Sequence, residues 1–317
     1  MNTIPSIFNQ RQINHTVMGG AEQSSLSKMP VDCIVLNRTD RTSRSRVFDN
    51  LIYRGFNSII SVERGSNRFA TANASSLYPS VRFVVALEDV TAGDMLNLGM
   101  SMATAPYVLV LQDDMCMDDI LFNPQLAKKL IALNDFCVCP RLTTSTFQSI
   151  PVRFFPTAEK SVFTVASSLS IQEGDVTLYP ADLAGFYDRN KYIQLGGADY
   201  TISSAYWQKV DLFCRAWLWG ERVSVQTSFS FSYSGDVPEE NQTVDSSYLR
   251  FYIKNLLPVF KNDHAEIPLS SFFAFRARRS CSFRDALELF GLARKWTEKN
   301  KYRFKKDAAT LIQDWGK

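Results

Sequence analysis

The sequence lacks the long apolar runs that membrane proteins and exported proteins need. No stretch approaches the roughly 18 uncharged apolar residues of a membrane span. The first thirty residues carry Gln, Asn and Ser where an export signal needs an apolar centre. We therefore expect a cytoplasmic protein that does not span a membrane, although contact with the inner face of the membrane stays open.

Metal-binding and charge signals are also sparse. The six cysteines are scattered without the paired CxxC spacing of a zinc site, which favours buried free thiols in a reducing compartment. Lys and Arg exceed Asp and Glu by only three, 35 against 32. So small an excess argues against a nucleic-acid-binding surface, and we expect no nucleic-acid partner.

The composition is that of a globular protein with a sizeable core. Hydrophobic residues make up 45% of the 317 residues and aromatic residues 13%, too much for a disordered chain or a coiled coil. Residues 1–30 are polar and without a sustained period, so we expect an N-terminal arm. A catalytic domain over 31–265 and a basic helical extension over 266–317 complete the predicted organisation.

Strand-like and helix-like patterns alternate after Pro30. Apolar runs at 32–36, 57–62, 81–87 and 107–111 predict strands, and residues 44–54 and 91–104 have helical spacing. This alternation predicts an α/β fold with a parallel, doubly wound sheet, in which ligands bind at the carboxyl ends of the strands.

Polar residues follow three of these strands. They are Asn37-Arg38-Thr39, residues 63–66 (ERGS) and Gln112-Asp113-Asp114. Two adjacent carboxylates at the end of a buried strand suit a divalent cation with a diphosphate. The alternative is that Asp113 and Asp114 cap a helix that begins near Asp118.

The second half of the sequence is less regular. Short β-type segments occur between 137 and 179, and residues 195–203 indicate a glycine-marked loop that enters a strand. A helix is expected at 204–213 and a strand at 223–231. Residues 216–222 (AWLWGER) would then lie between that helix and that strand.

Together these segments resemble the family 2-like glycosyltransferases of the GT-A fold, over about residues 31–235. The resemblance implies a doubly wound mixed sheet and transfer of a sugar from a nucleotide-diphosphate sugar. Five segments resemble motifs of the family and occur in the family's order. Residues 62–66 (VERGS) resemble its V-D-D-G-S turn, residues 93–99 (GDMLNLG) its G-x-x-x-A/L-N-x-G helix, and residues 111–114 (LQDD) its DxD motif. Residues 196–203 (GGADYTIS) with 210–213 (VDLF) resemble its acceptor-side segment, and residues 217–222 (WLWGER) resemble W-G-x-E-D.

The sequence departs from the family pattern at four positions. Arg64 replaces the second Asp of the turn, and Gln112 replaces the first Asp of DxD. Ser204 or its neighbour replaces an Arg, and Arg222 replaces the Asp of E-D. These changes predict a weak or dispensable Mn²⁺ or Mg²⁺ site, and they leave open a catalytically degenerate protein that only binds nucleotide sugars or glycans.

The resemblance implies a donor site and a metal site. Glu63 is the candidate for recognising the nucleotide base, with a solvated surface carboxylate as the alternative. Asp114 is the first candidate metal ligand and Asp113 the second, and His264 is a further candidate beside the alternative of a solvated loop histidine. The remaining donor-binding candidates are Asn37, Arg38, Thr39, Gln112, Asp113 and Arg222.

An inverting transfer also needs a general base for the acceptor hydroxyl. Glu221 is the first candidate for this base and Asp199 the second. Trp217, Trp219 and Gly197 are the acceptor-binding candidates, and the alternative for the tryptophans is core packing.

We therefore expect a hexosyltransferase-type enzyme that uses a nucleotide-sugar donor and a glycan, lipid-linked or small-molecule acceptor in glycan biosynthesis.

The C-terminal segment is strongly basic. Residues 276–317 hold twelve Lys or Arg and five Asp or Glu, which gives a net charge of +7, whereas the rest of the chain has a net charge of −4. Residues 282–285 (SFRD) predict a capped helix with 283, 286, 287, 290 and 293 on one face. This extension could pack on the catalytic domain or dock peripherally on a membrane.

Overall fold

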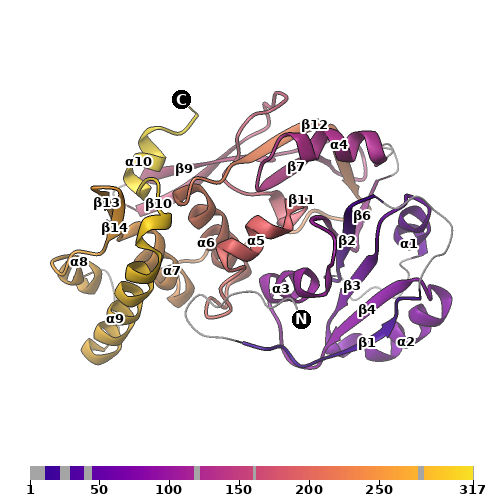
Figure 1. Ribbon diagram of the computed structural model, residues 1–317, viewed down its shortest axis with the longest axis horizontal. Helices are drawn as coiled ribbons and strands as arrows, with labels where there is room; N and C mark the ends of the chain where they lie inside the picture. The colour runs from indigo at the N-terminus through magenta and orange to yellow at the C-terminus, as the bar shows by residue number, and fades with distance from the viewer. Residues whose placement is uncertain are drawn as a thin grey trace.

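The computed structural model describes residues 11–21, 29–38, 45–117, 122–159, 162–277 and 282–316 (Figure 1). A central sheet of ten strands runs through the described chain, in the order β1-β4-β3-β2-β5-β11-β7-β12-β6 with β8 paired to β7. Its strands are β1 (His15–Gly19), β2 (Val31–Leu36), β3 (Ile59–Glu63), β4 (Val81–Ala86), β5 (Tyr107–Gln112), β6 (Met115–Cys116), β7 (Cys137–Thr143), β8 (Ser149–Ile150), β11 (Gly185–Asp188) and β12 (Val223–Tyr233).

The helices and two hairpins surround this sheet. The hairpins are β9 (Arg153–Glu159) with β10 (Val162–Ser168), and β13 (Val259–Lys261) with β14 (His264–Glu266). The helices are α1 (Ser45–Ile52), α2 (Arg68–Leu77), α3 (Ala92–Met102), α4 (Pro124–Ala132), α5 (Arg189–Leu195), α6 (Ala205–Leu218), α7 (Ser246–Phe251), α8 (Ser271–Ala277), α9 (Phe283–Asn300) and α10 (Ala308–Gln313). None of the described helices is long and apolar enough to cross a membrane.

The predicted α/β fold with a mixed sheet is confirmed. Strands β4, β3, β2 and β5 are parallel, and β11 joins β5 in the antiparallel direction. Every residue of β2 and β3 is buried, which is typical of parallel strands covered on both faces.

Part of the predicted N-terminal arm joins the central sheet. His15–Gly19 forms β1, which pairs antiparallel with β4 at the edge of the sheet. The edge strand was not recognised because it is half-exposed and lacks an apolar run. Residues 1–10 and 22–28 lie outside the described residues.

Helix α3 approaches the sheet closely at Gly99, which has no side chain to separate the two. A methyl group on Gly99 would lie 2.9 Å from a methyl of Ile34 and 3.2 Å from one of Val62. Asn97 then links α3 to the loop after α5, because its amide donates to the Ala198 carbonyl at 2.8 Å and its oxygen accepts from the Ala198 N–H at 2.9 Å. The family-like helix motif thus fixes the position of this loop.

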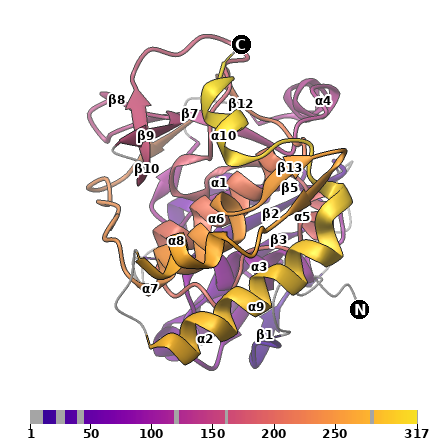
Figure 2. The same cartoon turned by 90° about the vertical axis from the view of Figure 1, so that its left-hand side faces the viewer.

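The C-terminal helices pack on the rest of the fold (Figures 1 and 2). Ser282 caps α9 as predicted, by accepting from the Asp285 N–H. The buried face of α9 consists of Ala286, Phe290, Ala293, Trp296 and Thr297. The assignment of Phe283 and Leu287 to this face was wrong, because their side chains are 62% and 55% exposed.

Candidate functional site

A cleft of about 1010 Å³ opens where the parallel strands end. Asn37 and Arg38 follow β2, Arg64 follows β3, and Gln112 ends β5, and all four side chains line it. This is the edge at which ligands bind in wound α/β sheets. The structure therefore brings together three of the predicted donor-binding residues, Asn37, Arg38 and Gln112. Thr39 lies outside the described residues.

The opposite side of the cleft comes from the second half of the chain. Phe154 and Ser167 of the β9–β10 hairpin, Tyr206 and Lys209 of α6, and Glu240 of the 237–245 segment line it. Lys209 forms an ion pair with Glu240, and its ammonium lies 4.2 Å from the centre of the Tyr179 ring. Sequence reasoning missed this group, since neither α6 nor residues 237–245 carries a recognisable motif there.

Arg38 is the centre of an ion cluster at the strand ends. Its Nη2 donates to both Asp114 oxygens at 2.7 Å, and its Nη1 pairs with Asp182. Its backbone N–H donates to Asp113 at 3.0 Å, and the Tyr233 hydroxyl donates to Asp182 at 3.1 Å. Asp182 has a φ of 55°, a backbone conformation that is unusual for a residue other than glycine and often occurs at functional sites.

The pKa values of this cluster follow from burial and pairing. Burial raises the pKa of the Asp114 carboxyl above its ordinary value, and the Arg38 guanidinium only partly opposes this. Burial lowers the pKa of Arg38, but the Asp182 and Asp114 carboxylates outweigh that effect and raise it. Arg38 is therefore a permanent cation in the cleft.

The residues at this position do not fit a divalent metal. Within the described residues, no group of three or more His, Cys, Asp or Glu side chains could hold a metal ion. Both oxygens of Asp114 are already engaged by Arg38. His264 begins β14 beside the C-terminal helices, where its Nδ1 contacts the Asn262 carbonyl at 3.0 Å, so it does not join the aspartates (Figure 1).

Asp113 and Asp114 cap none of the helices that the structure describes. Asp113 and Asp114 form the turn between β5 and β6. Helix α4 begins later, at Pro124, and Asn123 caps it by accepting from the N–H groups of Gln125 and Leu126. The start near Asp118 lies outside the described residues.

Glu63 is fully buried rather than exposed at the cleft. Its carboxylate accepts from the Ser61 hydroxyl at 2.6 Å and from the Asn37 amide. The predicted contact with a nucleotide base and the alternative of a solvated side chain both disagree with this position. Glu63 instead orients Asn37, and the next residue, Arg64, reaches the cleft.

Asp199 and Gly197 belong to a buried network under α6. Lys254 pairs with Asp199 at 3.1 Å and with Asp211 at 2.9 Å, while Arg215 pairs with Asp211 and donates to the Gly197 carbonyl. Burial alone would raise the pKa of Asp199, but the Lys254 ammonium, the hydrogen bonds from Thr201 and the Arg215 guanidinium together outweigh burial and hold that pKa below its ordinary value. A buried carboxylate paired in this way is unsuited to accept a proton from an acceptor, and neither residue lines the cleft.

The predicted loop at 216–222 is partly helical and lies away from the cleft. Residues 216–218 form the last turn of α6, whose first turn lines the cleft. Fourteen helical residues span about 20 Å, so Glu221 lies at the opposite end of the helix. There Glu221 pairs with Lys191 at 2.9 Å, and Arg222 donates to the Gly174 carbonyl at 2.9 Å.

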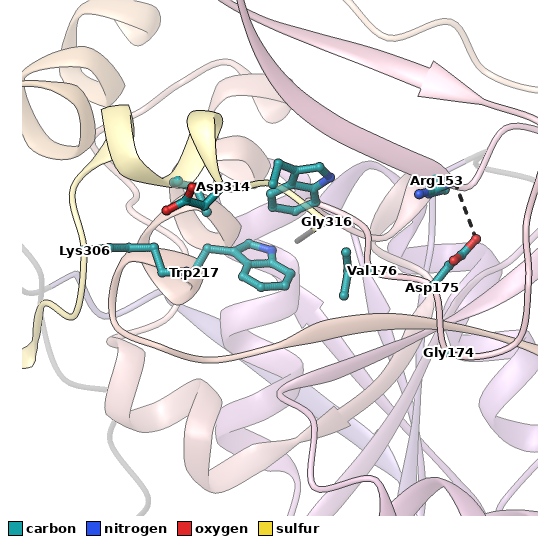
Figure 3. Close-up of a pocket in the computed structure, with 10 residues that line it drawn as sticks. Arg153, Gly174, Asp175, Val176, Trp217, Lys306, Asp314 and Gly316 are labelled. Carbon is teal, nitrogen blue, oxygen red and sulfur yellow. Dashed lines mark ion pairs between the residues drawn. The ribbon is translucent and has the colours of Figure 1, made fainter.

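The two tryptophans of this stretch pack against the C-terminal segment. The Trp217 ring contacts Trp315 edge-on at 4.8 Å, and the Trp219 ring stacks on Trp296 at 6.0 Å. Trp217 lines a pocket of about 310 Å³. Arg153 and Asp175, which form an ion pair, line the same pocket (Figure 3). This pocket and the cleft have no lining residue in common. The positions of Trp217 and Trp219 therefore agree with a role in packing rather than with the predicted role in binding the acceptor.

Comparison with known proteins agrees with the architecture. No protein family model and no curated protein sequence matches the chain. Among solved structures, it matches a crystal structure of GalNAc-T7 with UDP, GalNAc and Mn²⁺, with a TM-score of 0.63 and 10% identity. The fold is GT-A. The match covers 90% of this chain but 56% of that one, so the chain spans little more than half the length of this neighbour.

Proposed function

We propose that this GT-A protein transfers a sugar from a nucleoside-diphosphate sugar to an acceptor hydroxyl. The observation that carries the proposal is the cleft at the carboxyl ends of β2, β3 and β5, lined by Asn37, Arg38, Arg64 and Gln112. GalNAc-T7, which has the same fold, was crystallised with UDP and GalNAc, which supports a nucleotide-sugar donor and a carbohydrate acceptor.

The proposed reaction is an inverting displacement in this cleft. The acceptor oxygen attacks the anomeric carbon while the bond from that carbon to the diphosphate oxygen breaks. The acceptor proton passes to a carboxylate, and we assign this role to Glu240 in place of Glu221 and Asp199. Its side chain is 30% exposed on the cleft wall, where it forms an ion pair with Lys209.

Tyr206 and Phe154 provide aromatic surfaces on the same side of the cleft. Aromatic side chains offer an apolar face on which a sugar ring can stack. The acceptor in this proposal is therefore a carbohydrate, on a glycan, a lipid carrier or a small molecule.

Incubation with a panel of nucleotide sugars and simple glycoside acceptors tests the function directly. We expect release of nucleoside diphosphate with at least one donor, and the same nucleoside diphosphate should raise the melting temperature because it binds only the folded state. A shift in melting temperature without release from any donor would favour the alternative, a GT-A protein that binds nucleotide sugars or glycans without turnover.

Peripheral contact with the cytoplasmic face of a membrane is a second part of the proposal. Leu269, Phe273, Phe283 and Leu287 are 67%, 75%, 62% and 55% exposed, and we call them the α8–α9 patch. Phe272 joins its two aromatic members, with ring distances of 6.0 Å to Phe273 and 5.8 Å to Phe283. The basic sequence of 276–317 complements an anionic lipid surface, where each Lys or Arg contributes about 1 kcal/mol.

A double substitution of Phe273 and Phe283 by Ser should reduce sedimentation with anionic liposomes. Binding of the unchanged protein should require anionic lipid and fall with salt, because charges are screened over about 10 Å at 0.1 M. Phe69→Ser is the matched control, since Phe69 is 88% exposed on α2. Point substitutions are preferable to truncation at Ser280, which would remove the buried face of α9. Equal recovery in the supernatant with and without liposomes would contradict the proposal.

A further inference from the structure

We infer that Arg38, assisted by Arg64, supplies the positive charge that neutralises the donor diphosphate, so that donor binding requires no divalent metal. This inference rests on the proposed function and specifies its donor site. It follows from the ion cluster at the strand ends, where Arg38 already contacts the Asp114 carboxylate that a metal ion would need as a ligand.

The register of the sheet places Arg38, Arg64 and Asp114 at equivalent positions after strands β2, β3 and β5. Leu36 of β2 lies opposite Val62 of β3 and opposite Gln112 of β5. Arg38, Arg64 and Asp114 each follow two residues after these positions. Two guanidinium groups and one carboxylate therefore emerge together at the edge of the sheet where a phosphate group would bind.

The Arg38 guanidinium occupies the position between the carboxylates that a cation would take. It engages both oxygens of Asp114 and reaches Asp182 from the other side. The Arg38 side chain is 24% exposed and that of Asp114 only 5%, so this pair is largely shielded from water. A metal at Asp114 would have to displace a partly buried guanidinium that contacts two carboxylates.

Gln112 and Tyr233 hold the second carboxylate in place. The Gln112 amide donates to the Asp182 carbonyl at 2.7 Å, and the Tyr233 hydroxyl donates to the Asp182 side chain at 3.1 Å. Gln112 occupies the first position of the DxD-like segment, and there it fixes the residue that pairs with Arg38. The Gln at position 112, where the DxD pattern has an Asp, thus helps to hold Asp182 against Arg38.

Arg64 adds a second cation that has unused hydrogen-bonding capacity. It lines the cleft, and its Nε is buried without a partner in the part of the chain that the structure describes. A buried guanidinium N–H without a partner is costly, and a phosphate oxygen would satisfy it. Guanidinium groups bind phosphate oxygens in pairs and stay charged as the leaving diphosphate develops negative charge.

Calorimetric titration with UDP, GDP, ADP and dTDP, in excess EDTA and again with Mn²⁺, tests the inference. We expect at least one of these to bind in EDTA with an affinity within about twofold of that with Mn²⁺. Arg38→Gln should weaken that binding in EDTA by about tenfold or more, as expected for loss of a charge-assisted contact. Arg222→Gln is the matched control and should bind normally, because Arg222 lies outside the cleft.

The Asp114→Asn variant distinguishes a metal ion bound at Asp114 from Arg38 as the cation, because the two arrangements predict opposite effects on nucleotide binding. If Asp114 holds a metal, the substitution should abolish the Mn²⁺-dependent binding. If Arg38 is the cation, the variant should bind the nucleotide as tightly as the unchanged protein or more tightly, since a competing carboxylate is gone. Circular dichroism and thermal unfolding verify that each variant is folded.

Two other outcomes distinguish the inference from the proposed function. Binding that appears only with Mn²⁺ and disappears in Asp114→Asn would overturn the inference while leaving the glycosyltransferase proposal intact. Failure of every nucleotide to bind, with and without Mn²⁺, would contradict the proposed function itself.

Discussion

Replacing Glu240 by Gln is expected to lower kcat by about 10²-fold or more while nucleotide binding stays unchanged. A general base acts only while the proton moves, so its loss affects the chemical step rather than donor affinity. Glu240 is the appropriate target because it lines the cleft and its carboxylate is partly exposed to an incoming acceptor. Steady-state release of nucleoside diphosphate, with the donor identified from the panel, measures the effect.

Glu221→Gln is the matched control for this prediction. Glu221 pairs with Lys191 at the opposite end of α6, and we expect near-normal kcat from this variant. The reverse result, with Glu240→Gln active and Glu221→Gln inactive, would return the role of base to Glu221. An unchanged pH profile in Glu240→Gln together with a lower kcat would indicate a structural role for Glu240.

Replacing Lys254 by Met is expected to destabilise the protein by about 3–5 kcal/mol, as is usual when one partner of a buried ion pair is removed. The Lys254 side chain is fully buried between Asp199 and Asp211, and its ammonium lies 5.1 Å from the centre of the Trp296 ring. The substitution would leave Asp199 without its ammonium partner. The midpoint of urea unfolding and its slope give the change in the free energy of unfolding.

The same variant should lose part of its acid sensitivity. Asp199 has a pKa below its ordinary value in the folded protein, so it stabilises the fold above the pKa of the unfolded chain, about 4. That contribution is lost as the pH falls through the folded-state pKa. Lys295→Met on the exposed face of α9 is the control and should change neither stability nor pH dependence. A loss in Lys254→Met no larger than in this control would contradict a structural role for the network.

Local patterns in the sequence were sufficient to predict the first half of the sheet. Strands β2, β3 and β5 are mostly apolar and are followed by polar residues, and a parallel sheet brings such strand ends together. Asn37, Arg38 and Gln112 could therefore be assigned to the site before the structure was known. The cap of α9 at Ser282 was predictable for the same reason, since capping depends on residues close in sequence.

The sequence by itself thus determined the α/β class of this protein and the strand ends that line the cleft, because periodicity and capping act over a few residues. Only the tertiary structure decided which charged groups meet. Arg38 and Asp182 are 144 residues apart, and Lys209 and Glu240 are 31 apart. Such pairs depend on how distant segments pack, which no short-range pattern specifies. Packing likewise placed the two tryptophans against the C-terminal segment, and Glu221 beside Lys191 of α5, instead of in the cleft, because the length of α6 separates its two ends.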